Sequence, residues 1–206
     1  MEKLQLQALK YSFYLIFHPF DGFYDLKHEK KGNLISANII LMIIILVFIL
    51  SKQLTGFIFN NNSFRSLNII SEVISVILPL LLWCISNWSI TTLMDGEGSL
   101  KDIYITTCYA LVPIIISNFP LILISNFLTM DEADFYVFFY TLSFIWSVFL
   151  IFIGIMTVHQ FTVKKTIVTI IIAIIGVIVM LFLGLLFIAL IQQIINFCTF
   201  LYKELA

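Results

Sequence analysis

Residues 88–113, WSITTLMDGEGSLKDIYITTCYALVP, place a short polar turn between two long apolar runs. From Glu72 to Asp131 only four charged residues interrupt the chain, namely Asp95, Glu97, Lys101 and Asp102. Ser99 and Asp102 have the spacing of a capping box, in which each side chain binds a free backbone N–H of the other residue. The stretch therefore predicts a helix that ends near Leu93, a turn in water, and a second helix that begins at Ser99.

The composition predicts that most of the chain lies in lipid. Of its 206 residues, 61% are hydrophobic and only 11% are charged, whereas about a quarter of the residues in a soluble protein are charged. A soluble core could not bury that much apolar surface, so we expect an all-α, polytopic membrane protein. The net charge of −1 gives no indication of nucleic-acid binding.

Five apolar runs are long enough to cross a bilayer, which takes about 20 residues per helix. The predicted spans are residues 34–51, 67–93, 100–128, 135–158 and 166–197. In the third span, Pro113 and Pro120 lie one heptad apart, so kinks at these prolines would bend the helix on the same face. The fifth run is longer than one crossing needs and must tilt or protrude. Residues 34–206 are thus predicted to form a five-transmembrane-helix bundle.

Residues 1–33 precede the first span as a basic and aromatic arm. Apolar residues from Leu6 to Phe20 recur at steps of three or four, with a break at His18 and Pro19. The lysines of this segment that would favour anionic lipid head groups are Lys10, Lys27, Lys30 and Lys31. We expect an amphipathic segment that lies in the membrane interface. The alternative is a helix packed on the cytoplasmic ends of the bundle.

The distribution of lysine and arginine predicts the orientation in the cell membrane. Eight basic residues fall on the inner side if the N-terminus is cytoplasmic, and three fall outside. The inner residues are Lys3, Lys10, Lys27, Lys30, Lys31, Lys101, Lys164 and Lys165, and the outer ones are Lys52, Arg65 and Lys203. The N-terminus and the turns around Glu97 and Lys164 are therefore expected in the cytoplasm, and the C-terminus outside.

Small residues predict which helices pack closely, because they let helix backbones approach in lipid. The fourth span carries Ser143, Ser147 and Gly154 on one face, and the fifth carries Thr169, Ala173, Gly176 and, less well aligned, Gly184. We expect these two spans to form the tightest pair. The three cysteines, Cys84, Cys108 and Cys198, lack the spacing of a disulfide framework or a zinc site and are expected to be buried.

The turn between the second and third spans is the first candidate site. Its acids could hold a divalent cation, but the twelfth position of a calcium loop would be Thr106, where a glutamate is needed. No metal or other cofactor is expected. The remaining alternatives are a solvated turn or a contact with a basic patch, either on a partner or on the chain's own arm. The residues predicted to bind a partner are Asp95, Glu97, Lys101, Asp102, His159 and Lys164.

His159, at the inner end of the fourth span, could meet Asp95 or Glu97 and form a proton-sensitive pair. The alternative is an interface residue that complements the C-terminus of its helix. Glu72 lies in the first turn of the second span, where water and the helix N-terminus can stabilise its charge.

Two classes of function remain open. We find no nucleophile beside a base, no phosphate-binding loop and no H-E-x-x-H motif, so an enzyme is not expected. One class is a membrane scaffold that binds another membrane protein or a second copy. The other is a small transporter or channel with a path near Pro113, Asn118 and Pro120. A polar cavity at the membrane midplane would favour the transporter, and a solid bundle with an exposed face of small residues would favour the scaffold.

Several of these segments resemble the Yip (Ypt-interacting protein) membrane domain family, in its bacterial type. They are Trp88 with the D-G-E-G turn at 95–98, Y-A-L-V-P at 109–113, and H-P-F at 18–20 ahead of the first span. The resemblance implies a five-helix membrane domain. Eukaryotic members interact with prenylated Rab-type GTPases, but they have a longer soluble N-terminal region, so GTPase binding is not expected here. Some bacterial members are encoded beside sugar-uptake ABC transporters, which implies a transporter complex as partner.

Overall fold

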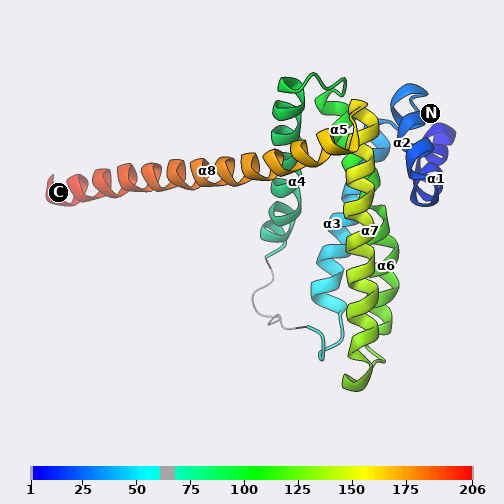
Figure 1. Cartoon of the computed structure of the whole chain (residues 1–206). Helices are drawn as coiled ribbons and strands as arrows, with labels where there is room; N and C mark the ends of the chain where they lie inside the picture. Colours follow the sequence, from blue (N-terminus) through cyan, green and yellow to red (C-terminus); the bar gives the residue numbers. More distant parts are fainter. Residues whose placement is uncertain (1, 61–67, 206) are drawn as a thin grey trace.

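The computed structural model describes residues 2–60 and 68–205, and all of them lie in helices or in the connections between helices. Side chains are described for residues 10–60 and 68–203. The elements, in chain order, are α1 (Glu2–Phe17), α2 (Pro19–His28), α3 (Leu34–Leu54), α4 (Ile69–Leu93), α5 (Leu100–Ala110), α6 (Val112–Ile124), the 3₁₀ turn η2 (Met130–Glu132), α7 (Ala133–His159) and α8 (Val163–Leu205) (Figure 1). Of the predicted features, Arg65 and the start of the second span at Leu67 lie outside the described residues.

Five helical segments in the described ranges are long and apolar enough to cross a membrane. They are α3, α4, α5 with α6, η2 with α7, and α8. This confirms the all-α fold and the multi-pass membrane class. The observed helices begin and end within a few residues of the prediction, except that α3 and α8 extend further at their C-terminal ends.

The third span is divided into two helices at Leu111. Pro113 explains the division, because proline has no backbone N–H to continue the helical hydrogen bonds, and its ring clashes with the preceding turn. The Leu111 N–H instead binds the Thr107 carbonyl oxygen at 3.2 Å, which closes α5, and α6 begins at the next residue. Pro120 lies inside α6 without ending it.

The core is formed mainly by α3, α5 and α7 together with the arm, and α4 and α6 also contribute to it. Tyr109 and Cys108 of α5 and Leu150 of α7 are completely buried. Leu15 of α1 and Phe23 of α2 are buried in the same core. The break at His18 is confirmed, since α1 ends at Phe17 and α2 starts at Pro19. The arm therefore packs on the bundle, which was the alternative placement.

The outer face of the arm remains exposed. Its large aromatic side chains there are Phe13, Phe17, Phe20 and Tyr24, and Phe17 has 77% of its surface accessible. Aromatic rings at the end of a membrane bundle suit the interface between lipid and water. The inner face of the arm thus packs on the bundle, and the placement of its outer face in the membrane interface stays a prediction.

Two ends of the bundle can be defined (Figure 1). The arm, the turn between α4 and α5, and the turn between α7 and α8 lie together at one end, which we call the arm end. The C-terminal end of α3 and η2 lie at the other end, the far end. At the far end, Lys52 Nζ lies 2.6 Å from Glu72 Oε2 in an ion pair between α3 and α4, although the angle is not that of a good hydrogen bond. Both residues thus neutralise each other.

Helix α8 runs across the other spans and leaves the bundle (Figure 1). It packs mainly on α4, where the Ser86 hydroxyl donates a hydrogen bond of 2.7 Å to the Ala173 carbonyl oxygen. Gly176 lies so close to Ser86 that a Cβ atom would collide with it. The prediction that the fourth and fifth spans form the tightest pair is therefore wrong. The small residues of α8 do allow a close approach, but the approach is to α4.

The other predicted packing residues have different neighbours. Gly154 of α7 faces Thr106 of α5 and Phe23 of the arm. Ser143 and Ser147 are buried on the inner face of α7. Gly184 has no described atom within 4 Å of the position of a Cβ. From residue 181 to 203 every side chain of α8 is exposed, including Cys198, which was expected to be buried.

Candidate functional site

The turn after α4 is closed by its backbone. Asp95 adopts a left-handed conformation with φ of 56°, which ends the helix in the manner usual for glycine or asparagine. The Gly96 N–H then donates a hydrogen bond of 2.8 Å to the Thr91 carbonyl oxygen. The left-handed conformation of Asp95 is thus part of the signal that stops α4.

The predicted capping box at the start of α5 is confirmed. The Ser99 N–H donates to the Asp102 carboxylate at 3.0 Å, and the Asp102 N–H donates to the Ser99 hydroxyl oxygen at 3.3 Å. The Asp102 side chain therefore caps the N-terminus of its own helix.

His159, the last residue of α7, packs against this turn. Its ring is buried, and the Gly98 N–H donates a hydrogen bond of 3.2 Å to Nδ1. Because Nδ1 accepts, the ring proton of this neutral tautomer is on Nε2. A Cβ at Gly98 would lie 2.6 Å from His159 Cε1, so this glycine provides room for the ring. The face of the ring stacks on Phe161, with the ring centroids 5.3 Å apart.

The contact of His159 differs from the predicted pair. Within the described part of the chain, neither Asp95 nor Glu97 forms a hydrogen bond or ion pair with His159. His159 therefore contacts the backbone of the turn and not its charged side chains. Neither glycine of the turn has a positive φ, so their role here is to allow the close approach of the imidazole.

The basic partner of Glu97 is Lys27, from the chain's own arm. Lys27 Nζ lies 3.3 Å from Glu97 Oε2 and donates a hydrogen bond of 2.7 Å to the Val158 carbonyl oxygen. The Lys27 side chain is only 14% exposed, whereas that of Glu97 is 56% exposed. The cation also complements the C-terminus of α7, where carbonyl groups lack helical partners. The structure thus supplies one of the alternatives for the acidic turn, a basic group on the arm.

The other predicted partner-binding residues remain accessible. Asp95, Lys101 and Lys164 are exposed near the arm end. The neighbouring Lys165 lies over the Phe161 ring, 4.3 Å from its centroid. Among the described side chains there is no group of three or more His, Cys, Asp or Glu placed to hold a metal ion.

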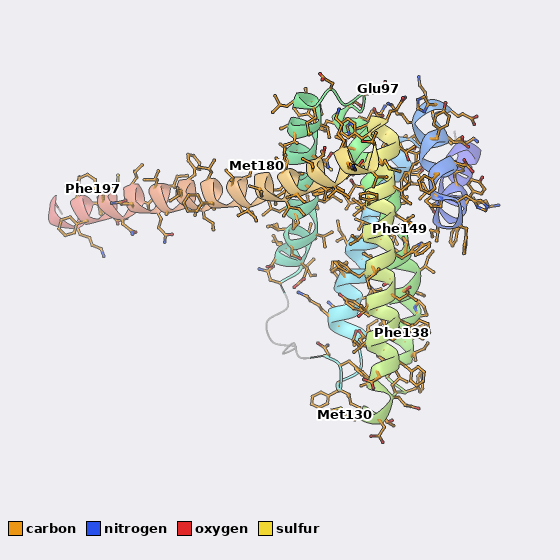
Figure 2. All side chains as sticks on the ribbon, in the orientation of Figure 1. Glu97, Met130, Phe138, Phe149, Met180 and Phe197 are labelled. Atoms are coloured by element: carbon orange, nitrogen blue, oxygen red, sulfur yellow. The ribbon has the colours of Figure 1, made fainter. Side chains whose placement is uncertain are left out.

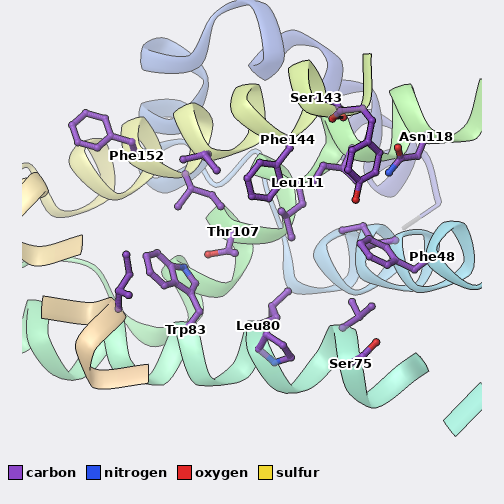
Figure 3. A pocket seen from close by; sticks show the side chains of 18 of the residues that line it. Phe48, Ser75, Leu80, Trp83, Thr107, Leu111, Asn118, Ser143, Phe144 and Phe152 are labelled. Atoms are coloured by element: carbon purple, nitrogen blue, oxygen red, sulfur yellow. Dashed lines mark hydrogen bonds between the residues drawn. The ribbon is translucent and has the colours of Figure 1, made fainter. Parts of the chain in front are cut away.

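A groove opens between α4 and α7 (Figure 3). Its volume is about 560 Å³, and residues of α3, α5, α6 and α8 complete its walls. Most of the lining is apolar: Ile44, Phe48, Val76, Pro79, Leu80, Trp83, Leu111, Ile114, Phe144, Val148, Ile151, Phe152, Ile170 and Ile174. The polar or partly polar lining residues are Ser75, Thr107, Asn118, Tyr140 and Ser143.

Two polar groups of the groove lack partners in the chain as described. The indole Nε1 of Trp83 is buried without a hydrogen bond, and the Asn118 amide, which lines the groove and is mostly buried, forms no hydrogen bond within the described ranges. In contrast, the hydroxyl groups of Ser75, Thr107 and Ser143 donate to carbonyl oxygens of their own helices. Unpaired polar groups in an apolar environment are costly, so Asn118 and Trp83 mark where a bound molecule would gain most.

A smaller cavity of about 270 Å³ lies toward the far end. It shares Phe48, Asn118 and Tyr140 with the groove and adds Lys52 and Asn60. Asn118, one of the residues predicted on a transport path, therefore lies where the two cavities adjoin.

Sequence reasoning missed two residues of these sites and one buried amide that lies outside them. Lys27 was counted only as part of a basic arm, because its partner Glu97 is 70 positions away. Nothing in the sequence distinguishes Trp83 from any other aromatic residue in an apolar run. Asn87 is completely buried in α4, and neither side-chain amide atom forms a hydrogen bond within the described ranges. A buried amide in a membrane span was the one signal that could have pointed to it.

The fold and these sites define a multi-pass helical membrane protein with an apolar groove between two spans. The chain belongs to the Yip1 domain family, because the family model of the Yip1 domain matches residues 13–194. The match includes most of the arm and extends well into α8, and it confirms the resemblance given by the short motifs. No curated protein and no solved structure is similar enough to match the chain.

Proposed function

We propose that this Yip1-family chain is a non-enzymatic membrane scaffold that binds a transmembrane helix of another membrane protein in the groove between α4 and α7. The lining of the groove carries the proposal. A cavity of about 560 Å³ with almost wholly apolar walls suits apolar side chains, whereas a hydrated solute would lose its hydrogen bonds to water there.

A helix fits the groove better than an acyl chain does. Asn118 and the Trp83 indole require a donor or acceptor, which a hydrocarbon tail lacks. A transmembrane helix can bring a Ser, Thr, Asn or Gln side chain to such a site, and these interhelical hydrogen bonds contribute to association in lipid. We therefore propose an apolar partner helix with one hydrogen-bonding residue at the level of Asn118.

The two helices that border the groove, α4 and α7, end close to the predicted partner-binding residues. Helix α4 ends in the turn that carries Asp95, and α7 ends in the turn that precedes Lys164. We propose that the exposed side chains of Asp95, Lys101 and Lys164 bind the polar segment that follows the partner helix. A transporter complex is the class of partner to test first.

A site-specific photocrosslinker tests the groove. In native membranes, p-benzoylphenylalanine in place of Val76, which lines the groove, should give a discrete adduct with a transmembrane helix of one protein. The same group in place of Leu142, exposed on α7 outside the groove, is the matched control and should give lipid adducts. Asn118→Leu should reduce the Val76 adduct. Lipid adducts alone at Val76 would contradict the proposal.

A transporter is the second candidate, favoured by the position of Asn118 between the two cavities. A continuous aqueous path would make Asn118→Cys reactive toward a small hydrophilic thiol reagent in sealed vesicles. The scaffold proposal predicts that this cysteine is unreactive while the partner is bound. Rapid reaction would move the preference to the transporter.

We also propose that the arm end is cytoplasmic in the cell membrane, from the eight-to-three excess of basic residues. In a variant with Cys84, Cys108 and Cys198 replaced by serine, Lys101→Cys should be protected from an impermeant maleimide in intact cells. Asp131→Cys at the far end should react. The reverse pattern would show that the orientation is inverted.

A further inference from the structure

The second half of α8 has no neighbour in the described chain. All side chains from residue 181 to 203 are exposed, and they point outward around the whole helix (Figure 2). The helix is 43 residues long, about twice the length that a single crossing needs. Most of the exposed side chains are apolar and can face lipid, but Gln192, Gln193 and Asn196 cannot be satisfied by hydrocarbon.

Four polar residues of this half, Gln192, Asn196, Thr199 and Lys203, lie on one line along the helix, whereas Gln193 lies on the neighbouring face. One stripe along α8 consists of Leu185, Ala189, Gln192, Asn196, Thr199 and Lys203. Its steps alternate between four and three positions, which is the 3.5-residue repeat of two helices packed along a common seam. Ala189 and Thr199 are small residues on this line, whereas the flanking positions carry Ile188, Ile195 and Phe200.

The stripe faces away from α4. Gly176 contacts Ser86 of α4, and Gln192 lies 16 positions further along the helix, or about 160° around it at 3.6 residues per turn. The stripe is thus on the open side of α8 and can be approached by another helix without displacing α4.

We propose that a second copy of this chain binds here, with the two α8 helices antiparallel and Gln192 of each copy opposite Asn196 of the other. A side-chain amide carries both donors and an acceptor, so a Gln–Asn pair is complementary in both directions. A two-fold axis repeats this pair, and it satisfies all four amides with one surface. A partner of different sequence would need its own matching amides, whereas a second copy already has them.

The course of α8 makes this arrangement compatible with one bilayer. Because α8 runs across the other spans, it lies along the membrane plane in this arrangement and does not form a crossing, although its length and composition would allow one. A two-fold axis parallel to the other spans then turns one α8 antiparallel to the other while both bundles keep the same orientation. The pairing does not involve the groove between α4 and α7, so it stands or falls independently of the proposed function. Lys203 ends the stripe, where its long side chain can extend toward the interface.

The register can be tested by disulfide formation. With Gln192 opposite Asn196, the pair is centred on Ile194, and Ala189 faces Thr199 of the second copy. Two differently tagged chains in a Cys198→Ser background, one with Ala189→Cys and the other with Thr199→Cys, should form a disulfide-linked dimer in native membranes. Each chain carries only one of the two introduced cysteines, so a bond between them within one chain cannot account for the product.

A control pair keeps the register but leaves the stripe. The control combines Leu190→Cys in one chain with the native Cys198 in the other. In the proposed register these two positions are at the same level along the helices, but both lie outside the stripe, so no disulfide-linked product is expected. Equal products from both pairs would indicate random collision, and a product only between two copies of Ala189→Cys would indicate a parallel pair. Either result overturns the proposal, as does the absence of any dimer.

Substitution of the amides provides a second readout. Gln192→Leu with Asn196→Leu should weaken dimerisation about tenfold, as measured by single-molecule photobleaching in lipid vesicles, because two interhelical hydrogen-bonded pairs are lost. Gln193→Leu removes the same type of side chain from the neighbouring face and should leave the dimer unchanged. All three side chains are exposed on the half of α8 that has left the bundle, so folding should be unaffected. Loss of the dimer with Gln193→Leu alone would assign the contact to a different face.

Discussion

The arm end and the second half of α8 differ in how their polar groups are paired. At the arm end, the chain supplies the partners itself: Lys27 binds Glu97 and the Val158 carbonyl oxygen, and His159 accepts from the Gly98 N–H. Along the second half of α8, Gln192 and Asn196 are exposed. The first region is a contact within the chain between elements far apart in sequence, in which Lys27 and His159 are largely buried, and the second is an exposed surface that we propose binds a second copy.

The comparison shows that the acidic turn is first of all a structural connection. Its glycine at position 98 makes room for His159, and its glutamate holds the arm. The amides without a partner in the described chain lie elsewhere, in the groove and on α8. The proposed helix contacts are therefore placed at these amides, whereas the exposed charges of the arm end are proposed to bind only the polar segment that follows a partner helix.

The largest expected difference between the two regions is at their glycines. A Cβ at Gly154 would overlap Thr106 and lie 3.2 Å from the Phe23 ring, whereas Gly184 faces open space. Gly154→Ala should lower the free energy of unfolding by about 1–3 kcal/mol through overpacking. Gly184→Ala should raise the stability of its helix by up to about 1 kcal/mol. Reversible denaturation in mixed detergent micelles would measure both.

Equal effects of these two substitutions would contradict the contrast between a packed and an open region. Gly176→Ala extends the comparison along α8, because Gly176 touches Ser86 while Gly184, two turns later, touches nothing described. We expect Gly176→Ala to behave like Gly154→Ala. The difference between positions 176 and 184 would then locate where α8 leaves the bundle.

The sequence predicted those features that depend on neighbouring residues. The capping box of Ser99, the break at Pro19 and the five apolar spans are all encoded within a few positions, and the structure contains each of them. The placement of α8 could not be predicted in this way. Small residues such as Ala173 and Gly176 show that another backbone can approach closely, but they do not specify which helix approaches.

The contacts of the candidate sites could not be predicted from the sequence for the same reason. Lys27 and Glu97 are 70 positions apart, and a single sequence contains no information that pairs them. The groove is formed by side chains from six helices, none of which differs in composition from an ordinary membrane span. Only the unusual polar residue Asn118 indicated part of it, because an amide within an apolar span is costly unless it is bound.

A lysine in each region gives the second comparison. Lys27→Met removes the cation that binds the end of α7, and the loss of a buried, charged hydrogen bond should cost about 1.5 kcal/mol. Lys203→Met changes the same residue type on the open half of α8 and should leave the stability of the monomer unchanged. Hydrogen exchange of the α2 amides would report release of the arm in the first variant only.

Glu97→Gln separates the two partners of Lys27. Glu97 is more than half exposed, and exposed ion pairs contribute less than about 1 kcal/mol. We therefore expect a smaller effect for Glu97→Gln than for Lys27→Met, since the hydrogen bond to the Val158 carbonyl oxygen remains. If both substitutions release the arm equally, the ion pair and not the helix terminus is the main contact of Lys27.

The smallest expected effect is a dependence of arm packing on acid, which α8 should not share. The Lys31 ammonium donates a hydrogen bond of 2.6 Å to Asp25 and holds the pKa of that carboxyl below its ordinary value, which is about 3.9. A carboxyl group with a lowered pKa stabilises the folded arm above its ordinary pKa, and this contribution is lost as the pH falls through the lower, folded value. Protection of the α2 amides, corrected for intrinsic exchange, should therefore be constant from pH 7 to pH 5 and decline only below about pH 4. Asp25→Asn should abolish that decline, while α8 amides should show none; an unchanged decline in the variant would assign the acid sensitivity to another group.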